Sequence, residues 1–96
     1  MKITEIRMRK INNKSRLKAV ASITFNDCFV VHGVRLIDGE KGLFMAMPSR
    51  KTRRGEFFDV AHPINNDFRI KLEKALTEQY KEITEKEEEE KEEEEE

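Results

Sequence analysis

Apolar and polar residues alternate along the first 61 residues in short runs that are typical of β-strands. The clearest run spans residues 17–25, where every second residue is apolar and would lie on one face of a sheet. Two further runs, 29–37 and 43–47, are almost continuously apolar, which predicts strands that are buried on both faces. The charged segment 3–10 and the short segment 57–61 complete a set of five predicted antiparallel strands.

Turn-forming residues separate these runs. Asn26 and Asp27 lie between the second and third predicted strands, and both residue types tolerate left-handed backbone. The segment 38–42 contains two glycines and an aspartate, which favours a second turn. Pro48 closes the fourth run because its nitrogen cannot donate to a sheet.

The apolar spacing changes from two residues to that of a helix after Pro63. One helical face would then be apolar, and it would be formed by Phe68, Leu72, Ala75, Leu76, Tyr80 and Ile83. Asn65, Asn66 or Asp67 could cap the start of this helix. The predicted fold class is α+β: an antiparallel β-sheet of about five strands followed by one C-terminal amphipathic helix.

A single helix covers only one face of a small sheet. Because the runs 29–37 and 43–47 have two apolar faces, another element must cover the second face. A second copy of the chain is the economical solution, which predicts a homodimer. The alternative is that the N-terminal segment folds back over that face.

Charge is divided between the two ends of the chain. The formal net charge of the 96 residues is only -1. Residues 1–84 nevertheless carry 17 Lys and Arg against 10 Asp and Glu, a net of +7, whereas residues 85–96 carry ten Glu and two Lys, a net of -8. We therefore expect a domain at 1–84 and an acidic, largely disordered tail at 85–96, whose first turns could extend the helix. Such a tail could compete with nucleic acid for the basic body.

Few residues are suited to catalysis. Cys28 and His32 supply only two of the ligands that a zinc site needs, so we interpret them as a small buried thiol near a turn and a hydrogen-bonded core histidine. His62 precedes Pro63 and is interpreted as a loop residue that orients the turn into the helix. The phosphate-binding glycine motifs are absent from the sequence. We therefore predict a protein that is not an enzyme, with no catalytic residue, metal, cofactor or small-molecule substrate.

The sequence also predicts a cellular compartment. No apolar run approaches the roughly 18 residues of a membrane span. The first ten residues lack the apolar core of a signal peptide, and the single cysteine cannot form an internal disulfide. We expect a cytoplasmic protein without membrane contact.

The strongest candidate site is the charged loop 49–55, which holds four cations within five residues. Such clusters bind phosphates, because arginine donates in a fork and both basic side chains release condensed counterions. Phe57 and Phe58 follow, and an exposed ring could stack on a base. Strand alternation predicts that only one of them faces the core. The predicted nucleic-acid-binding residues are Ser49, Arg50, Lys51, Thr52, Arg53, Arg54, Arg69, Lys71 and Lys74.

A third group of cations lies in the first predicted strand, at Arg7, Arg9 and Lys10. The sequence leaves open whether these residues join the loop and the helix in one surface. A solvated loop and a solvated helix face are the alternatives for the other two groups.

A family resemblance is carried by the stretch 29–52, FVVHGVRLIDGEKGLFMAMPSRKT, and by GEF at 55–57 and HPIN at 62–65. These motifs resemble the stage V sporulation protein G family, SpoVG, also called septation protein SpoVG. The resemblance runs from about residue 1 to residue 84, and the block GLFMAMPSRKT at 42–52 is highly specific.

The resemblance implies a small bacterial, cytoplasmic, dimeric protein of β-sheet and helix that binds DNA and RNA. Members of the family are pleiotropic regulators in sporulation, asymmetric septation, virulence and cell-envelope control. The chain departs from the family pattern in its basic loop. Arg53 and Arg54 stand where the family often has Pro-Asp, and Phe58 stands where it often has a basic residue. The loop is thus expected to be more basic and less rigid than usual.

Two functions follow as predictions. The first is a site-preferring DNA- and RNA-binding regulatory protein that affects sporulation, septation and gene expression, and that holds phosphates through the basic loop 50–54. The alternative is a protein-interaction adaptor that regulates cell division without direct nucleic-acid binding. Its basic loop would meet an acidic protein partner.

Overall fold

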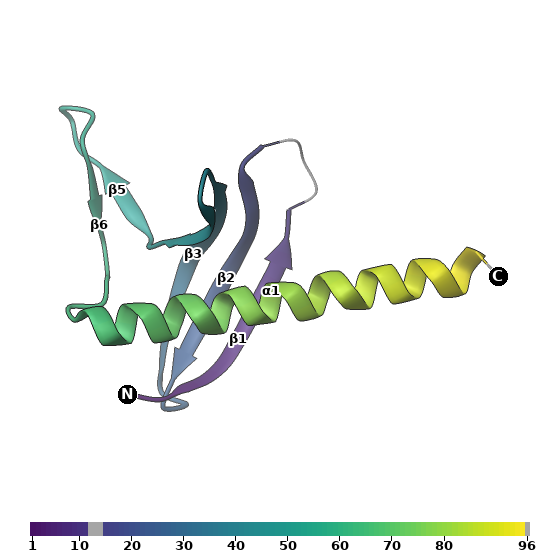
Figure 1. The fold of residues 1–96 in the computed structure, drawn as a ribbon. Helices are drawn as coiled ribbons and strands as arrows, with labels where there is room; N and C mark the ends of the chain where they lie inside the picture. The colour runs from purple at the N-terminus through teal and green to yellow at the C-terminus, as the bar shows by residue number, and fades with distance from the viewer. Residues whose placement is uncertain (12–14, 96) are drawn as a thin grey trace.

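The computed structural model describes residues 1–11 and 15–95, with side chains described up to Lys86. In this part the chain forms a four-stranded antiparallel sheet, a two-stranded ribbon and one long helix (Figure 1). The sheet contains, in spatial and chain order, β1 (Ile3–Lys10), β2 (Leu17–Phe25), β3 (Phe29–Gly39) and β4 (Gly42–Ala46). The ribbon pairs β5 (Ser49–Lys51) with β6 (Phe57–Asp59), and the helix is α1 (Asn66–Glu95). The predicted α+β class is confirmed.

Four of the five predicted strands form the sheet, but the fifth does not join it. The segment predicted as a strand at 57–61 forms β6 at Phe57–Asp59 and pairs only with β5. The segment that forms β5 was predicted to be part of a charged loop. A three-residue strand of Ser, Arg and Lys shows no apolar alternation by which it could be recognised in the sequence. The loop of the prediction is therefore a short hairpin, called the basic ribbon below.

The turn between β2 and β3 has the predicted left-handed backbone. Asn26 and Asp27 have φ angles of 51° and 53°. The side chain of Asn26 accepts a hydrogen bond from the Lys2 amide at 2.9 Å, and the Asn26 amide donates to the Lys2 carbonyl at 2.8 Å. The turn is thus fastened to the start of β1.

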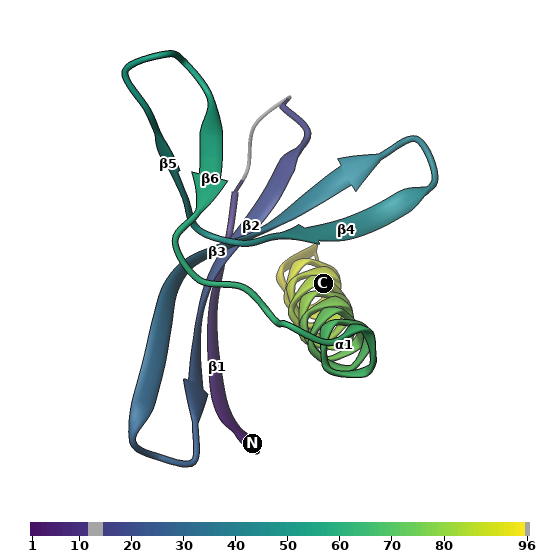
Figure 2. The ribbon, with the colours of Figure 1, turned by 90° about the vertical axis from the view of Figure 1, so that its left-hand side faces the viewer.

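The hydrophobic core lies between α1 and one face of the sheet (Figure 2). Alternate residues of β2 point toward it, as predicted, and Leu72 and Leu76 of α1 are each 1% exposed. The buried residues are Ala19, Ala21, Ile23, Phe25, Val34, Leu36, Met45, Met47, Leu72 and Leu76. Phe68 and Tyr80 of the predicted helical face are half-buried against this cluster, and Ala75 and Ile83 of the same face are also half-buried.

The second face of the sheet has no cover among the described residues (Figure 2). The N-terminal segment does not fold back over it, because β1 pairs edge to edge with β2 in the same sheet. Val30 and Phe44 on β3 and β4 remain 44% and 43% exposed. The prediction that these two strands are buried on both faces therefore does not hold within one chain.

A bulge bends β3 and positions its second half. The register moves from Ile23↔Val31 to Ala21↔Val34, and Gly33 in this step has a φ of 79°. A left-handed backbone angle is accessible to glycine without steric cost. The bend directs the rest of β3 to the side of the helix and away from the basic ribbon, and β4 returns from there toward the ribbon (Figure 2).

The helix begins at a side-chain cap and extends into the acidic segment. The Asn65 side-chain oxygen accepts a hydrogen bond from the Phe68 amide at 2.7 Å, which confirms one of the three predicted caps. The helix continues to Glu95, so the domain boundary predicted at residue 84 lies within a continuous helix. Disorder of the tail stays a prediction. Within the described chain, no helix combines the length and apolar character that a membrane crossing requires.

Candidate nucleic-acid interface

The basic ribbon projects away from the sheet, near the start of α1 (Figure 1). Its turn is fixed by three hydrogen bonds around Thr52: the Thr52 amide donates to the Glu56 carbonyl, the Gly55 amide to the Thr52 carbonyl, and the Glu56 amide to the Thr52 hydroxyl. Gly55 has a φ of 85°, which is typical of the left-handed residue that closes a three-residue hairpin loop. Arg53 and Arg54 thus occupy a hydrogen-bonded turn. The expectation that the loop is less rigid than usual in the family stays a prediction.

The pairing register divides the ribbon into two faces. Arg50 lies opposite Phe58, whereas Lys51 lies opposite Phe57 on the other face. The Lys51 ammonium is 5.9 Å from the centre of the Phe57 ring. The two phenylalanines therefore alternate as predicted, but neither is core-facing, because Phe57 is 69% and Phe58 58% exposed.

The cations of the ribbon have no acidic partner in the part of the chain that the structure describes. Among the described residues, none of Arg50, Lys51, Arg53 and Arg54 forms an ion pair, and all four are exposed. Thr52, the predicted binding residue between these cations, already has a partner, because its hydroxyl accepts a hydrogen bond from the Glu56 amide within the turn. The ribbon therefore presents four charges that are available to an anion.

Only one of the predicted helix cations lies beside the ribbon. Arg69 lines a hollow together with Ser49, Phe57 and Asp59 of the ribbon. Lys71 follows two residues later, which places it about 160° round the helix from Arg69. Lys74 lies in a second hollow among both acidic and basic side chains, those of Arg69, Glu73, Glu78 and Lys81. The exposed side of the helix is thus a mixed surface.

The cations of β1 lie on the far edge of the sheet from the ribbon. The sheet order is β1-β2-β3-β4, and the ribbon follows β4. Arg7 is also paired with Glu5, and this hydrogen bond raises the pKa of the arginine. Arg7 and Arg9 therefore do not extend the ribbon directly.

A functional candidate that the sequence prediction missed is Arg35 of β3. It lines the same hollow as Arg69, which has a volume of about 360 Å³. This ribbon–helix hollow is lined by Arg35, Met45, Ala46, Met47, Ser49, Phe57, Asp59 and Arg69. The one signal in the sequence was a charged residue inside an otherwise apolar strand, GVRLI at 33–37.

The two residues considered as metal ligands lie at the surface. Cys28 and His32 are both exposed, so their interpretation as a buried thiol and a core histidine was wrong. His32 is hydrogen-bonded, however, because its Nδ1 lies 2.8 Å from the Ser22 hydroxyl on β2. Among the described residues, no group of three or more His, Cys, Asp and Glu is arranged to hold a metal ion.

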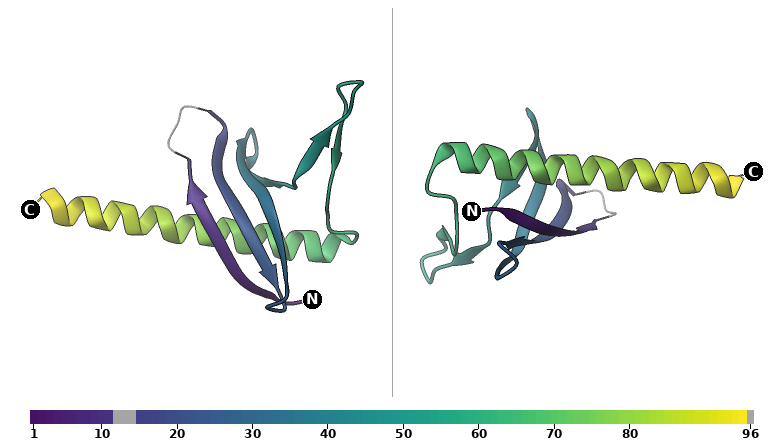
Figure 3. Two further views of the ribbon diagram at one scale, coloured as in Figure 1. Left: turned by 180° about the vertical axis from the view of Figure 1, so that it is seen from behind. Right: turned by 90° about the horizontal axis from the view of Figure 1, so that it is seen from below.

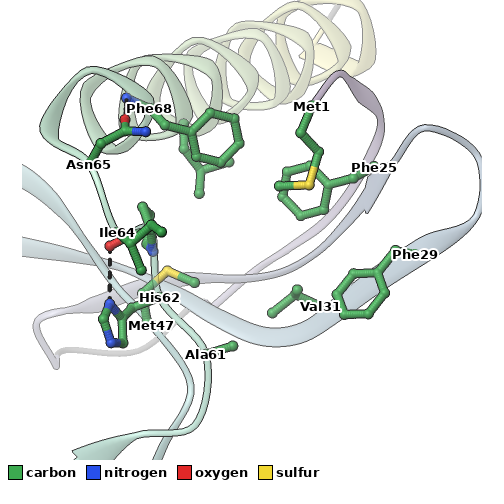
Figure 4. Close-up of a pocket in the computed structure, with 12 residues that line it drawn as sticks. Met1, Phe25, Phe29, Val31, Met47, Ala61, His62, Ile64, Asn65 and Phe68 are labelled. Atoms are coloured by element: carbon green, nitrogen blue, oxygen red, sulfur yellow. Dashed lines mark hydrogen bonds between the residues drawn. The ribbon is translucent and has the colours of Figure 1, made fainter.

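A separate, apolar hollow lies where the linker after β6 meets the start of α1 (Figure 4). Its volume is about 340 Å³, and Phe25, Phe29, Met47 and Phe68 are among the residues that line it. His62 borders it, and its Nδ1 is 3.0 Å from the Pro63 carbonyl, in keeping with its predicted role in the turn into the helix. The views from behind and below show that this end of the helix also lies beside the N-terminus (Figure 3).

Comparison with known proteins gives a consistent result. The SpoVG family model matches residues 1–82. A protein of Caldanaerobacter subterraneus is 58% identical over 85 residues, which cover 88% of this chain and 93% of the relative. Proteins of Caldicellulosiruptor saccharolyticus and Phytoplasma australiense are each 53% identical over 83 residues, covering 86% of this chain and 94% and 86% of those relatives. All three are named as candidate septation proteins, SpoVG. The family match ends before the acidic segment.

Proposed function

The chain belongs to the SpoVG family, and from that premise we propose that it is a cytoplasmic, homodimeric regulator that binds DNA and RNA in septation and sporulation. Its primary contact would be the basic ribbon, through phosphates. The relatives are named for septation, and the charge of the body supplies the reason for a nucleic-acid partner.

One observation carries the proposal: the ribbon extends away from the body and holds four cations that form no ion pair with any described residue, two of them on its hydrogen-bonded turn. Binding of these arginine and lysine side chains to phosphates is favourable in free energy, because it releases counterions that are condensed on the nucleic acid. The ordered turn reduces the backbone conformational entropy that the loop loses on binding. Arg69 extends the contact from the ribbon onto the helix.

A second copy of the chain would duplicate this surface. The uncovered second face of the sheet and the apolar hollow of Figure 4 are the surfaces that a homodimer could bury. Two ribbons related by a twofold axis would suit a long polyanion.

The test is the combined substitution of Arg50, Lys51, Arg53 and Arg54 by alanine. We expect electrophoretic mobility shifts of DNA and RNA to disappear at physiological salt, and the wild-type affinity to fall steeply as salt rises. The matched control removes the same charge elsewhere, at the exposed residues Lys2, Arg9, Lys41 and Lys81. Equal affinity of the ribbon variant and the wild type would show that the ribbon is not the binding site.

The adaptor is the second candidate, and exposed apolar residues beside the ribbon favour it. Val60 and Ile64 of the linker are 68% and 93% exposed, which is typical of protein contact surfaces when such residues gather. Retention on heparin and a salt titration against random DNA separate the two functions. An adaptor would bind neither at low salt, and the proposed regulator would bind both.

A further inference from the structure

The ribbon–helix hollow contains two arginines whose charge is not balanced by a partner. Arg35 and Arg69 are both half-buried, and in the described part of the chain neither forms an ion pair or a side-chain hydrogen bond. An arginine that is partly removed from water without a partner is costly, and an anion between two such groups restores the lost interactions. The hollow, at about 360 Å³, is also within the size range of ligand pockets.

An exposed aromatic ring borders the same hollow. The ribbon register places Phe57 on the face that carries Lys51, Ser49 and Asp59, and three of these four residues line the hollow. Phe58 lies on the opposite face and does not line it. A phenylalanine that is 69% exposed beside two guanidinium groups is the combination on which unpaired bases stack.

The remaining polar groups are compatible with a nucleotide. The Ser49 hydroxyl can donate to a phosphate, and the Asp59 carboxylate can accept a hydrogen bond from a base amino group.

Two carboxylates lie in this region. Glu73 is directed to the edge of β4, where its Oε2 accepts a hydrogen bond from the Met45 amide at 3.4 Å. Asp59 lines the hollow together with Arg35 and Arg69 and lies on the same face of the ribbon as Lys51. Positive charge therefore exceeds negative charge at the hollow.

We propose that this hollow binds one unpaired nucleotide of a single-stranded nucleic acid, with its phosphate on Arg35 and Arg69 and its base on Phe57. The inference rests on the proposed nucleic-acid function and goes beyond it, because a site of this kind would make the protein prefer single strands to duplexes. A base within a duplex is stacked on both faces and cannot reach the ring. The exposed tip of the ribbon, by contrast, can hold phosphates of either form.

The test compares a labelled single-stranded oligonucleotide with the duplex of the same sequence, by fluorescence anisotropy at fixed ionic strength. The wild type should bind the single strand more tightly. Phe57→Leu should weaken single-strand binding by roughly 5- to 150-fold, the usual effect of losing one stacked base, and leave duplex binding unchanged. Arg35→Gln should lower the slope of log affinity against log salt for the single strand by about 0.7, as expected for one lost phosphate contact.

The matched control is Phe58→Leu, the same substitution on the opposite face of the ribbon. It should leave both affinities at the wild-type level, and circular dichroism should show unchanged folding for both phenylalanine variants, because both rings are exposed. Equal effects of Phe57→Leu and Phe58→Leu, or equal wild-type affinity for the two forms of nucleic acid, would overturn the inference while leaving the proposed function intact. A wild type that binds neither form at low salt would overturn both.

Discussion

Single residues fix the two ends of the linker between the ribbon and the helix. At its helical end, the Asn65 side chain accepts a hydrogen bond from the Phe68 amide, which satisfies one of the backbone donors that the first turn of a helix leaves without a partner. At the ribbon end, the Val60 amide donates to the Pro48 carbonyl at 2.7 Å. These bonds hold Arg69 close to the ribbon, so the cap one helical turn before Arg69 contributes to the shape of the proposed site.

The cap gives a direct prediction. Asn65→Ala should lower the free energy of unfolding by about 0.5–2 kcal/mol, because the Phe68 amide loses its acceptor. Asn66→Ala is the control, since Asn66 is exposed and forms no side-chain hydrogen bond in the described structure. Urea denaturation followed by circular dichroism measures both. Equal stability of the two variants would mean that Asn65 does not cap the helix in solution.

At the scale of elements, the helix depends on a narrow stripe of side chains. Leu76→Ala should destabilise the fold by about 2–5 kcal/mol, because this side chain is 1% exposed within the core. Ile70→Ala should change the stability by less than about 0.5 kcal/mol, because Ile70 is 59% exposed on the same helix. Thermal unfolding of the two variants provides the comparison. A large loss at Ile70 would instead indicate that this residue is covered by a partner.

The four strands of the sheet could be predicted from the sequence, whereas the basic ribbon and the hollow beside it could not. The alternation in β2 follows from burial of every second residue, so it could be seen in the sequence alone. The basic ribbon could not be seen in the sequence, because the pairing of β5 with β6 depends on the turn geometry around Gly55 and not on apolar content. Arg35 was missed for a related reason. Its place in the hollow depends on the bulge at Gly33 and on the approach of α1, which are tertiary features.

At the scale of the whole molecule, the uncovered sheet face and the apolar hollow bear on assembly. Val30 and Phe44 of the sheet remain 44% and 43% exposed in one chain, and exposed apolar side chains that gather on one face are typical of a protein contact surface. Sedimentation at micromolar concentration should therefore give twice the 11.4 kDa mass of one chain. A stable 11.4 kDa species under these conditions would contradict the proposed homodimer.

The final prediction concerns the acidic segment, whose effect depends on where the helix carries it. The ribbon lies near the start of α1, and the C-terminus lies at the far end (Figure 1). Along a helix, residues 85–95 are separated from Arg69 by about 24–39 Å. This separation exceeds the Debye length of about 8 Å at 0.15 M ionic strength but is comparable with the 30 Å expected at about 0.01 M.

Truncation after Ile83 should therefore raise the affinity for random DNA at about 0.01 M ionic strength, where ten glutamates still repel phosphates. At about 0.15 M the truncated and full chains should bind equally, because the field of a distant segment is screened. Anisotropy titrations at the two ionic strengths measure the difference. Unchanged affinity at low ionic strength would show that the tail does not act on the body, whereas a gain that persists at 0.15 M would require direct contact between the tail and a ribbon. A bent helix, a disordered tail or the tail of a second copy could make that contact, so the salt dependence distinguishes a repulsive field from competitive binding.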